Sequence, residues 1–371
     1  MVKSRPYRIL IGGGGTGGHV FPAIAIADAL KERDPETEFL FVGALGKLEM
    51  EKVPEAGYSI EGLPVAGFQR RVTLKNISFF YKLLVSMGRS RRIVRRFNPD
   101  VAVGVGGYAS GPILKAAARF GVPILIQEQN SYAGMTNRLL ARSARVICVA
   151  YEKMDRYFPA DRLVMTGNPV RQQLVNLEGD PEQSRKEFDL EEDRKVCLVI
   201  GGSLGARTLN RSFMDGLDKL NRDKLQVLWQ CGRYYHAEVE ERVRTSGLRN
   251  IRVLPFISRM DLAYNVADVI VSRAGAISIS ELCLVGKPVI LVPSPNVAED
   301  HQTHNAEALV SKTAALMVRD QEAVEQLVDR MLGLMDDSLL KKELSTNIRQ
   351  LGIPDASQGI AAEVLKILEE K

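Results

Sequence analysis

The feature that most constrains the fold is a glycine-rich turn between an apolar run and an amphipathic segment, and this arrangement occurs twice. Residues 12–18 place six glycines in seven positions, after the apolar run 7–11 and before the amphipathic segment 20–30. Residues 195–213 repeat the order of strand, glycine turn and helix about halfway along the chain. Because such units build parallel sheets covered by helices, the repeat predicts two similar doubly wound α/β domains.

Two longer stretches support a duplicated plan. Residues 99–130 and 267–296 each run through Asp-Val, an apolar strand, a glycine turn, a helix, Gly-x-Pro and a second apolar strand. This is the pattern of a βαβ unit whose strands are buried on both faces. A chain of 371 residues is long enough for two such cores. We place the boundary near Asn168-Pro169, which predicts domains over 1–167 and 168–354.

Composition restricts the class of protein. The chain is 45% hydrophobic and 26% charged, as in an ordinary globular protein. It has no apolar run long enough to span a bilayer, and its first residues lack the apolar core of a signal peptide, so we expect a cytosolic protein. Its four cysteines are widely spaced and form no C-x-x-C pair, which favours buried free thiols over disulfides or metal ligands.

A basic stretch stands out from the modest net charge of +5. Residues 62–99 contain no acid and nine Lys or Arg residues. Within them, Ile77, Phe80, Leu84 and Met87 recur at helical spacing, which predicts a helix that is apolar on one side and cationic around it. Such a helix suits an anionic membrane surface. A core helix with a basic outer face fits the pattern as well, and nucleic acid ranks last because no nucleic-acid motif accompanies the charge.

The first glycine turn predicts an anion site. Glycines allow close approach of a ligand, and the amides at a helix start attract phosphate. The turn matches G-x-G-x-x-G in two overlapping frames, which points to a dinucleotide. However, the next strand ends at Gly43-Ala44-Leu45-Gly46, where a nicotinamide-binding fold places an acid for the ribose. A phosphate ligand other than that cofactor, or a turn that serves packing alone, remains open.

The second glycine turn has two interpretations. Residues 201–205 match G-x-S-x-G, the nucleophile turn of hydrolases, and Asp261 or Asp268 with His301 or His304 would complete a triad. A glycine turn whose backbone and Ser203 hydroxyl hold a phosphate needs no such partners, and we favour it.

Further polar residues follow other predicted strands. Ala276, Ile277 and Ser278 lie at a helix start and Glu281 one turn later, which suits a phosphate and a ribose, or equally a helix with an acid near its start. His301 and His304 lie near Asp300, but no third metal ligand is evident, and binding to sugar hydroxyls explains the cluster as well. The segment 128–130 exposes Glu-Gln-Asn after a buried strand, and Arg171 lies beside the domain boundary.

Seven strings occur in a fixed order along the chain: GGTGGHVFPAIAIA, GVGGYASGP, EQNSYAGMTNR, GNPVR, GGSLGAR, SRAGAISISE and HQTHNA. With them the sequence resembles, from end to end, the MurG family of peptidoglycan glycosyltransferases. The resemblance implies transfer of N-acetylglucosamine (GlcNAc) from UDP-GlcNAc to undecaprenyl-diphospho-muramyl-pentapeptide, with inversion to a β-1,4 linkage. It also implies the GT-B fold, two Rossmann-like domains facing a cleft, with a C-terminal helix within 355–371 packing back on the first domain.

The resemblance also implies roles by position. The donor contacts would be Arg171 and Ser203 on the diphosphate, the backbone around Ile257 on uracil, Glu281 on the ribose, the helix-start residues Ala276, Ile277, Ser278, Ile279 and Ser280, and Gln302 and Asn130 on the sugar. Thr16, Gly17 and Gly18 would face the reacting sugar and, with Gly106, Gly107 and Tyr108, the acceptor diphosphate.

The reaction needs a base, and His19 suits this task. The positive end of a helix disfavours an imidazolium, so we expect His19 to be neutral and basic near pH 7, with Glu128 as its rival. No metal or other cofactor is expected, because helix-start amides and Arg171 can stabilise the leaving diphosphate.

The lipid-linked acceptor makes the basic helix a candidate membrane contact, which predicts a peripheral enzyme on the cytoplasmic face of the plasma membrane. Cell-wall synthesis proteins are possible partners. The alternatives are a UDP-GlcNAc 2-epimerase, a transferase with a soluble acceptor, a serine hydrolase, and a polybasic binder without catalysis.

Overall fold

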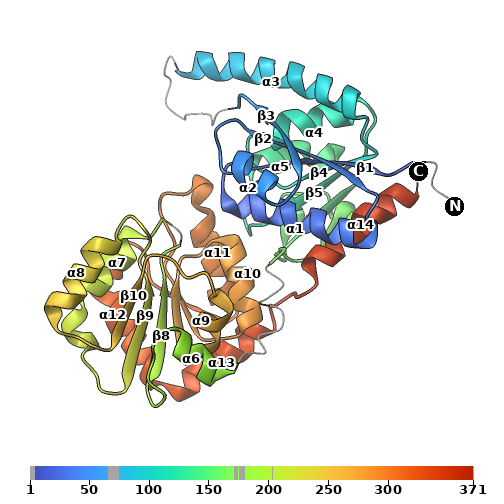
Figure 1. Cartoon of the computed structure of the whole chain (residues 1–371). Coiled ribbons are helices and arrows are strands. Elements are labelled where there is room, and N and C mark those ends of the chain that lie inside the picture. The colour runs from blue at the N-terminus through green and yellow to red at the C-terminus, as the bar shows by residue number, and fades with distance from the viewer. Residues whose placement is uncertain (1–4, 66–74, 171–173, 175–179, 203, 371) are drawn as a thin grey trace. The chain divides into compact units, whose positions relative to one another are not determined.

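A computed structural model of the chain describes residues 5–65, 75–170, 174, 180–202 and 204–370, without the side chains of 75–80 and 298. The chain forms two compact units. The N-terminal unit comprises 1–170 together with 355–371, and the C-terminal unit comprises 171–354. Each unit is built around one parallel sheet, which confirms the predicted pair of doubly wound α/β domains (Figure 1).

The N-terminal unit has a seven-stranded sheet in the order β3-β2-β1-β4-β5-β6-β7. Its strands are β1 Arg8–Gly12, β2 Glu38–Ala44, β3 Ser59–Leu63, β4 Val101–Gly104, β5 Ile124–Glu128, β6 Val146–Val149 and β7 Leu163–Met165. The order reverses between β1 and β4, which pair in register Ile9↔Val101. Chain segments that follow these two strands therefore leave in opposite directions, and such a switch point is where doubly wound sheets bind ligands.

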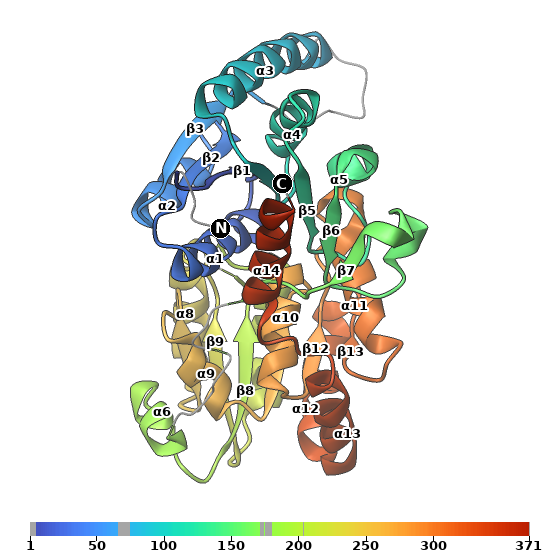
Figure 2. The ribbon, with the colours of Figure 1, turned by 90° about the vertical axis from the view of Figure 1, so that its right-hand side faces the viewer.

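Helices cover both faces of this sheet because side chains along each strand alternate between the faces. Ile9 and Ile11 pack with α1 Gly17–Arg33 and α14 Ala356–Glu369, which lie side by side (Figure 2). Leu10 faces the opposite cluster, which contains residues of α4 Ser110–Arg119 and α5 Met135–Leu140. The shorter helix α2 Glu49–Glu55 follows β2. Burial of each large aliphatic side chain contributes about 1.5–3 kcal/mol to folding.

The predicted basic helix is α3 Lys75–Phe97. Near its end Ile93 and Val94 are buried in the core, whereas Leu84 is 72% exposed and Tyr81 is 70% exposed. Met87 is half-buried, and the side chains of Ile77 and Phe80 lie outside the described residues. The core interpretation therefore holds for the last turns of α3 and is wrong for Leu84.

The C-terminal unit has a six-stranded sheet in the order β10-β9-β8-β11-β12-β13. Its strands are β8 Lys195–Ile200, β9 Leu225–Gln230, β10 Ile251–Leu254, β11 Val269–Ser272, β12 Val289–Leu291 and β13 Leu316–Met317. Its helices are α6 Pro181–Glu187, α7 Arg207–Asp215, α8 His236–Ser246, α9 Met260–Val266, α10 Ala276–Val285, α11 His301–Val310, α12 Ala323–Asp336 and α13 Ser338–Arg349. The order reverses between β8 and β11, which gives this sheet a switch point of its own.

Two sequence predictions concern the whole chain. The cysteines Cys148, Cys197, Cys231 and Cys283 are all buried free thiols, as predicted. Burial raises the pKa of the Cys148 thiol to about 12, so this thiol stays protonated and unreactive at neutral pH. Among the described residues, no helix is both long enough and apolar enough to cross a membrane.

Candidate active site

The first glycine turn lies at the N-terminal switch point, between β1 and α1. Gly14 and Gly15 have φ of 137° and 96°, values that residues with a side chain rarely adopt. Thr16 precedes the helix in an extended conformation, and its carbonyl accepts from the amides of His19 and Val20 at 3.1 Å each. The first amides of an α-helix have no partner within the helix, so the start of α1 offers donors to an anion.

The turn after β4 meets the first turn at this switch point. Gly106 and Gly107 have φ of 90° and 85°. A Cβ on Gly107 would overlap the carbonyl group of Gly14, so the two turns touch backbone to backbone. A Cβ on Gly106 would lie 3.0 Å from Cδ2 and from Nε2 of the His19 ring. The structure therefore brings His19 into direct contact with the turn after β4.

The His19 ring has a partner on its other nitrogen. Its Nδ1 lies 3.2 Å from Thr16 Oγ1, and the residue is half-buried. When Nδ1 carries the proton and donates to Thr16, Nε2 is left as the basic nitrogen. Nε2 is also the nitrogen that lies against Gly106.

Glu49 was not predicted from the sequence, yet it holds the first glycine turn. Its carboxylate accepts from the amide of Gly15 and from the amide of Ala44, at 2.8 Å each, and the residue is 2% exposed. A Cβ on Gly14 or on Gly43 would overlap its side chain, so both glycines make room for the carboxylate. The only sequence signal is an acid at the first position of α2, where helices commonly carry one.

Glu128 is buried rather than exposed as the sequence suggested, at 1% exposure. Its Oε1 accepts from the amide and the Nδ2 of Asn130 at 3.0 and 3.2 Å, and its Oε2 accepts from the amide of Gly134 and from Asn137 Nδ2 at 3.0 and 2.9 Å. Gln129 is buried too, and its side-chain amide donates to the carbonyl of Val105 at 2.8 Å. The Glu128 carboxylate is thus already engaged by four protein donors, which favours a positioning role for this residue.

The second glycine turn follows β8 in the C-terminal unit. Gly202 and Gly205 have φ of 79° and 82°. A Cβ on Gly205 would overlap the carbonyl of Cys231, and one on Gly232 would overlap the backbone of Gly205, so this turn packs against the segment after β9. The predicted phosphate ligands Ser203 and Arg171 lie outside the described residues.

Helix α10 begins at the carboxyl end of β11. Gly275 is extended before the helix, and as a glycine it has no side chain with which to cap the first turn. The residues 276–278 and 280 are half-buried, and Ile279 is buried. Glu281 is 3% exposed, and Tyr264 donates its hydroxyl to Glu281 Oε2 at 3.5 Å.

Two other predicted donor contacts have internal partners. The amide of Ile257, a buried residue, donates to Gln230 Oε1 at 3.3 Å. Gln302 Oε1 accepts from the amides of Ala274 and Ser294 at 3.2 and 2.8 Å, and thereby joins the turns after β11 and β12. These two bonds fix the Gln302 side-chain oxygen and thereby orient the amide nitrogen of the same group, which is a hydrogen-bond donor.

The two histidines near Gln302 face different carboxylates. His301 Nε2 lies 3.6 Å from Glu299 Oε2, and His304 Nδ1 lies 3.6 Å from Glu307 Oε2. Within the described part of the chain, no three His, Cys, Asp or Glu residues form a group that could hold a metal. Glu299 and Asp300 have φ of 53° and 51°, a strained backbone of the kind that collects at functional sites.

The predicted residues thus gather at sheet edges within each unit. In the N-terminal unit, residues 16–19, 106–108 and 130 follow β1, β4 or β5, and residue 128 is the last residue of β5, so all lie at the carboxyl ends of the strands. In the C-terminal unit, residues 257, 276–281 and 302 follow β10, β11 and β12. The predicted membrane residues are separate from these groups and lie along α3.

Comparison with known proteins shows the family of both halves of the chain. Residues 9–149 match the glycosyltransferase family 28 N-terminal domain, and residues 196–360 match the C-terminal domain of the same family. A relative from Bacteroides thetaiotaomicron, UDP-N-acetylglucosamine--N-acetylmuramyl-(pentapeptide) pyrophosphoryl-undecaprenol N-acetylglucosamine transferase, is 54% identical over 98% of both chains. A protein with the same description from Parabacteroides distasonis is 53% identical over 99% of this chain and 100% of its own.

A solved structure matches as well. The crystal structure of MurG from Acinetobacter baumannii superposes with a TM-score of 0.79 at 29% identity, covering 97% of this chain and all of the other. Both halves of the chain therefore have counterparts in known glycosyltransferases, in agreement with the expected GT-B fold.

Proposed function

The chain belongs to glycosyltransferase family 28, among the N-acetylglucosaminyltransferases named above, and from this premise we propose that it transfers GlcNAc from UDP-GlcNAc to a muramyl-pentapeptide carried on undecaprenyl diphosphate. The relatives' descriptions name this reaction, and their identity to the chain extends over nearly its whole length. A transferase of this kind needs a base, an acceptor site and a site for the nucleotide.

In the proposed reaction the acceptor hydroxyl attacks the anomeric carbon of GlcNAc, and the bond from that carbon to the UDP oxygen breaks. His19 Nε2 takes the hydroxyl proton, while Nδ1–H is held by Thr16 Oγ1 at 3.2 Å. The amides at the start of α1 and the turn at Gly106 and Gly107 receive the acceptor diphosphate. The observation that supports His19 as the base is the position of its ring between Thr16 and Gly106 at the N-terminal switch point.

The donor is assigned to the C-terminal unit. The uncapped start of α10 offers amides to the UDP diphosphate, together with Arg171 and Ser203. Glu281 faces the ribose, and the amide nitrogen of Gln302 reaches the sugar. Negative charge grows on the leaving diphosphate as the sugar departs, so donors fixed in advance lower the barrier.

Because the acceptor is carried on a lipid, the enzyme must act at the surface of a bilayer. We assign its contact with the membrane to the exposed part of α3. Leu84 and Tyr81 are largely exposed there, and Arg89, Arg91 and Arg92 are exposed along the same helix. An apolar patch beside basic residues attaches a protein to anionic lipid without a spanning helix. In this proposal the enzyme is peripheral and acts at the cytoplasmic face of the membrane.

Transfer of label from radioactive UDP-GlcNAc tests the proposal. Incubation with a muramyl-pentapeptide diphosphate on a short prenyl chain should move the label to the lipid-linked product. Label recovered only as an epimer of the donor, with no need for an acceptor, would instead support a 2-epimerase.

A further inference from the structure

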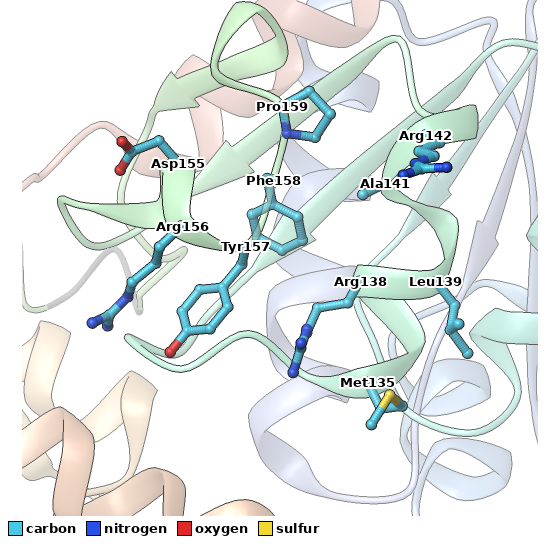
Figure 3. Close-up of a pocket in the computed structure, with 10 residues that line it drawn as sticks. All are labelled: Met135, Arg138, Leu139, Ala141, Arg142, Asp155, Arg156, Tyr157, Phe158 and Pro159. Carbon is cyan, nitrogen blue, oxygen red and sulfur yellow. The ribbon is translucent and has the colours of Figure 1, made fainter.

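A cavity of about 490 Å³ lies in the N-terminal unit, outside the glycine turns (Figure 3). One wall comes from α5 and the short 3-10 turn after it, Ala141–Ser143, and the other from the 3-10 turn Met154–Arg156 and the residues that follow. The lining residues used below are Met135, Arg138, Leu139, Arg142, Arg156 and Tyr157.

Three arginines line the cavity, and all three are exposed. Within the described ranges, no Asp or Glu lies within ion-pair distance of Arg138, Arg142 or Arg156. Asp155 also lines the cavity, but its carboxylate points away from the Tyr157 ring (Figure 3). The described lining thus carries three guanidinium groups and one carboxylate, which is an excess of positive charge.

Two of the guanidinium groups are held in place. Arg138 Cζ lies 5.5 Å and Arg156 Cζ lies 4.8 Å from the centroid of the Tyr157 ring. Arg156 also donates to the carbonyl of Ser131 at 3.0 Å. Cation–π contacts and this hydrogen bond fix the planar groups before a ligand arrives, which lowers the entropy cost of binding.

Part of the cavity wall lies close in sequence to the proposed acceptor residues. Its walls follow the carboxyl ends of β5 and β6, and Ser131 is the next residue after Asn130. The apolar residues Met135 and Leu139 are 54% and 77% exposed at its rim. The ligand that fits is therefore an anion with apolar groups beside its charge, bound next to the acceptor.

We propose that this cavity binds carboxylates of the peptide on the muramyl acceptor, an inference that rests on the proposed function. The relatives' descriptions name a pentapeptide on that acceptor, and a peptide chain ends in a carboxylate. Arginine pairs with carboxylates through two parallel hydrogen bonds, which suits the fixed guanidinium groups of Arg138 and Arg156. Met135 and Leu139 then contact apolar groups of the peptide.

The experiment compares three short-prenyl acceptors: one with free peptide carboxylates, one with these carboxylates amidated, and one without the peptide. Arg138→Gln, Arg142→Gln and Arg156→Gln are assayed against wild type, with Arg119→Gln as the control. Arg119 is an exposed arginine of α4 outside the cavity. Each cavity variant should raise the KM for the free-carboxylate acceptor about tenfold, with kcat nearly unchanged.

The other two acceptors provide the contrast. Cavity variants and wild type should have equal KM values for the amidated and the peptide-free acceptors. An equal rise in KM for all three acceptors would overturn the proposal, because it would show a general loss of acceptor binding. Weaker binding to phosphatidylglycerol vesicles with an unchanged KM for every acceptor would also overturn it and would assign the cavity to lipid phosphates.

Failure of the proposed function is a separate result. If wild type transferred GlcNAc to none of the acceptors, the transferase proposal itself would be wrong. Arg142 has no stacking contact with Tyr157 in the structure, so Arg142→Gln keeps the test decisive if Arg156→Gln does not fold.

Discussion

The two switch points share one topology but arrange their glycine turns differently. At the N-terminal switch point, the turn after β1 packs against the turn after β4, with Gly14 against Gly107. At the C-terminal one, the turn after β8 packs against the segment after β9, with Gly205 against Gly232. In the sheet, β9 lies on the side of β8 away from β11, the strand that precedes α10.

The same sheet topology therefore supports two different kinds of site. In the N-terminal unit, His19 lies between the Thr16 hydroxyl and Gly106 of the turn after β4. In the C-terminal unit, side chains such as Gln302 and Glu281 lie near the start of α10 and offer hydrogen bonds that suit a nucleotide and its sugar. We therefore expect the acceptor and the base at the N-terminal switch point and the donor at the C-terminal one.

The largest effect is expected at His19. His19→Ala should lower kcat by about 10²–10⁴-fold, because the proton acceptor is lost, while UDP binds as tightly as before. Stopped assays of label transfer and equilibrium binding of UDP measure the two quantities. Glu128→Gln is the comparison variant, and a greater loss of kcat in it than in His19→Ala would assign the base to Glu128.

The contact between the turns can be broken by one methyl group in each unit. In Gly107→Ala the new methyl group would overlap the Gly14 carbonyl, and alanine would have to adopt a φ of 85°. The substitution should therefore separate the turn after β1 from the turn after β4 and lower kcat about 100-fold. Gly205→Ala meets an equally close backbone at φ 82° but should act mainly on the KM for the donor. Similar kinetic changes in both variants would contradict the division of roles.

Glu49 tests whether the first turn depends on its buried carboxylate. Glu49→Ala leaves the amides of Gly15 and Ala44 without their acceptor, each at a cost of about 1–3 kcal/mol. We expect a lower melting temperature and a loss of kcat of about 10-fold to 100-fold, with donor affinity unchanged. Glu49→Gln, which keeps one oxygen, should lie between this variant and wild type. Wild-type kcat in Glu49→Ala would show that the turn holds its shape alone.

The smallest effect concerns the membrane. Leu84→Ser removes an exposed apolar side chain and should weaken binding to anionic vesicles about tenfold, while UDP affinity stays the same. Phe80→Ser is expected to act in the same direction. Leu339→Ser is the matched control, because Leu339 is also largely exposed but belongs to the C-terminal unit. Equal vesicle binding by Leu84→Ser and wild type would remove α3 from the contact.

The sequence predicted the sheets because glycine turns and buried apolar runs are local signals. The same local signals placed the candidate residues at the ends of the strands. Burial of Glu128 was not predictable, because its donors Gly134 and Asn137 come from a later loop and from α5. The role of Glu49 was not predictable for a similar reason. It depends on the close approach of Gly14 and Gly43 to the Glu49 side chain, and only the folded chain brings these residues together.

The most direct test of the account is a crystal structure of the protein with bound UDP-GlcNAc. We predict the diphosphate of the nucleotide at the start of α10, with the ribose beside Glu281 and the side-chain amide of Gln302 toward the sugar. A nucleotide bound at the start of α1, against His19 and Gly106, would reverse the assignment of the two units and contradict the mechanism proposed here.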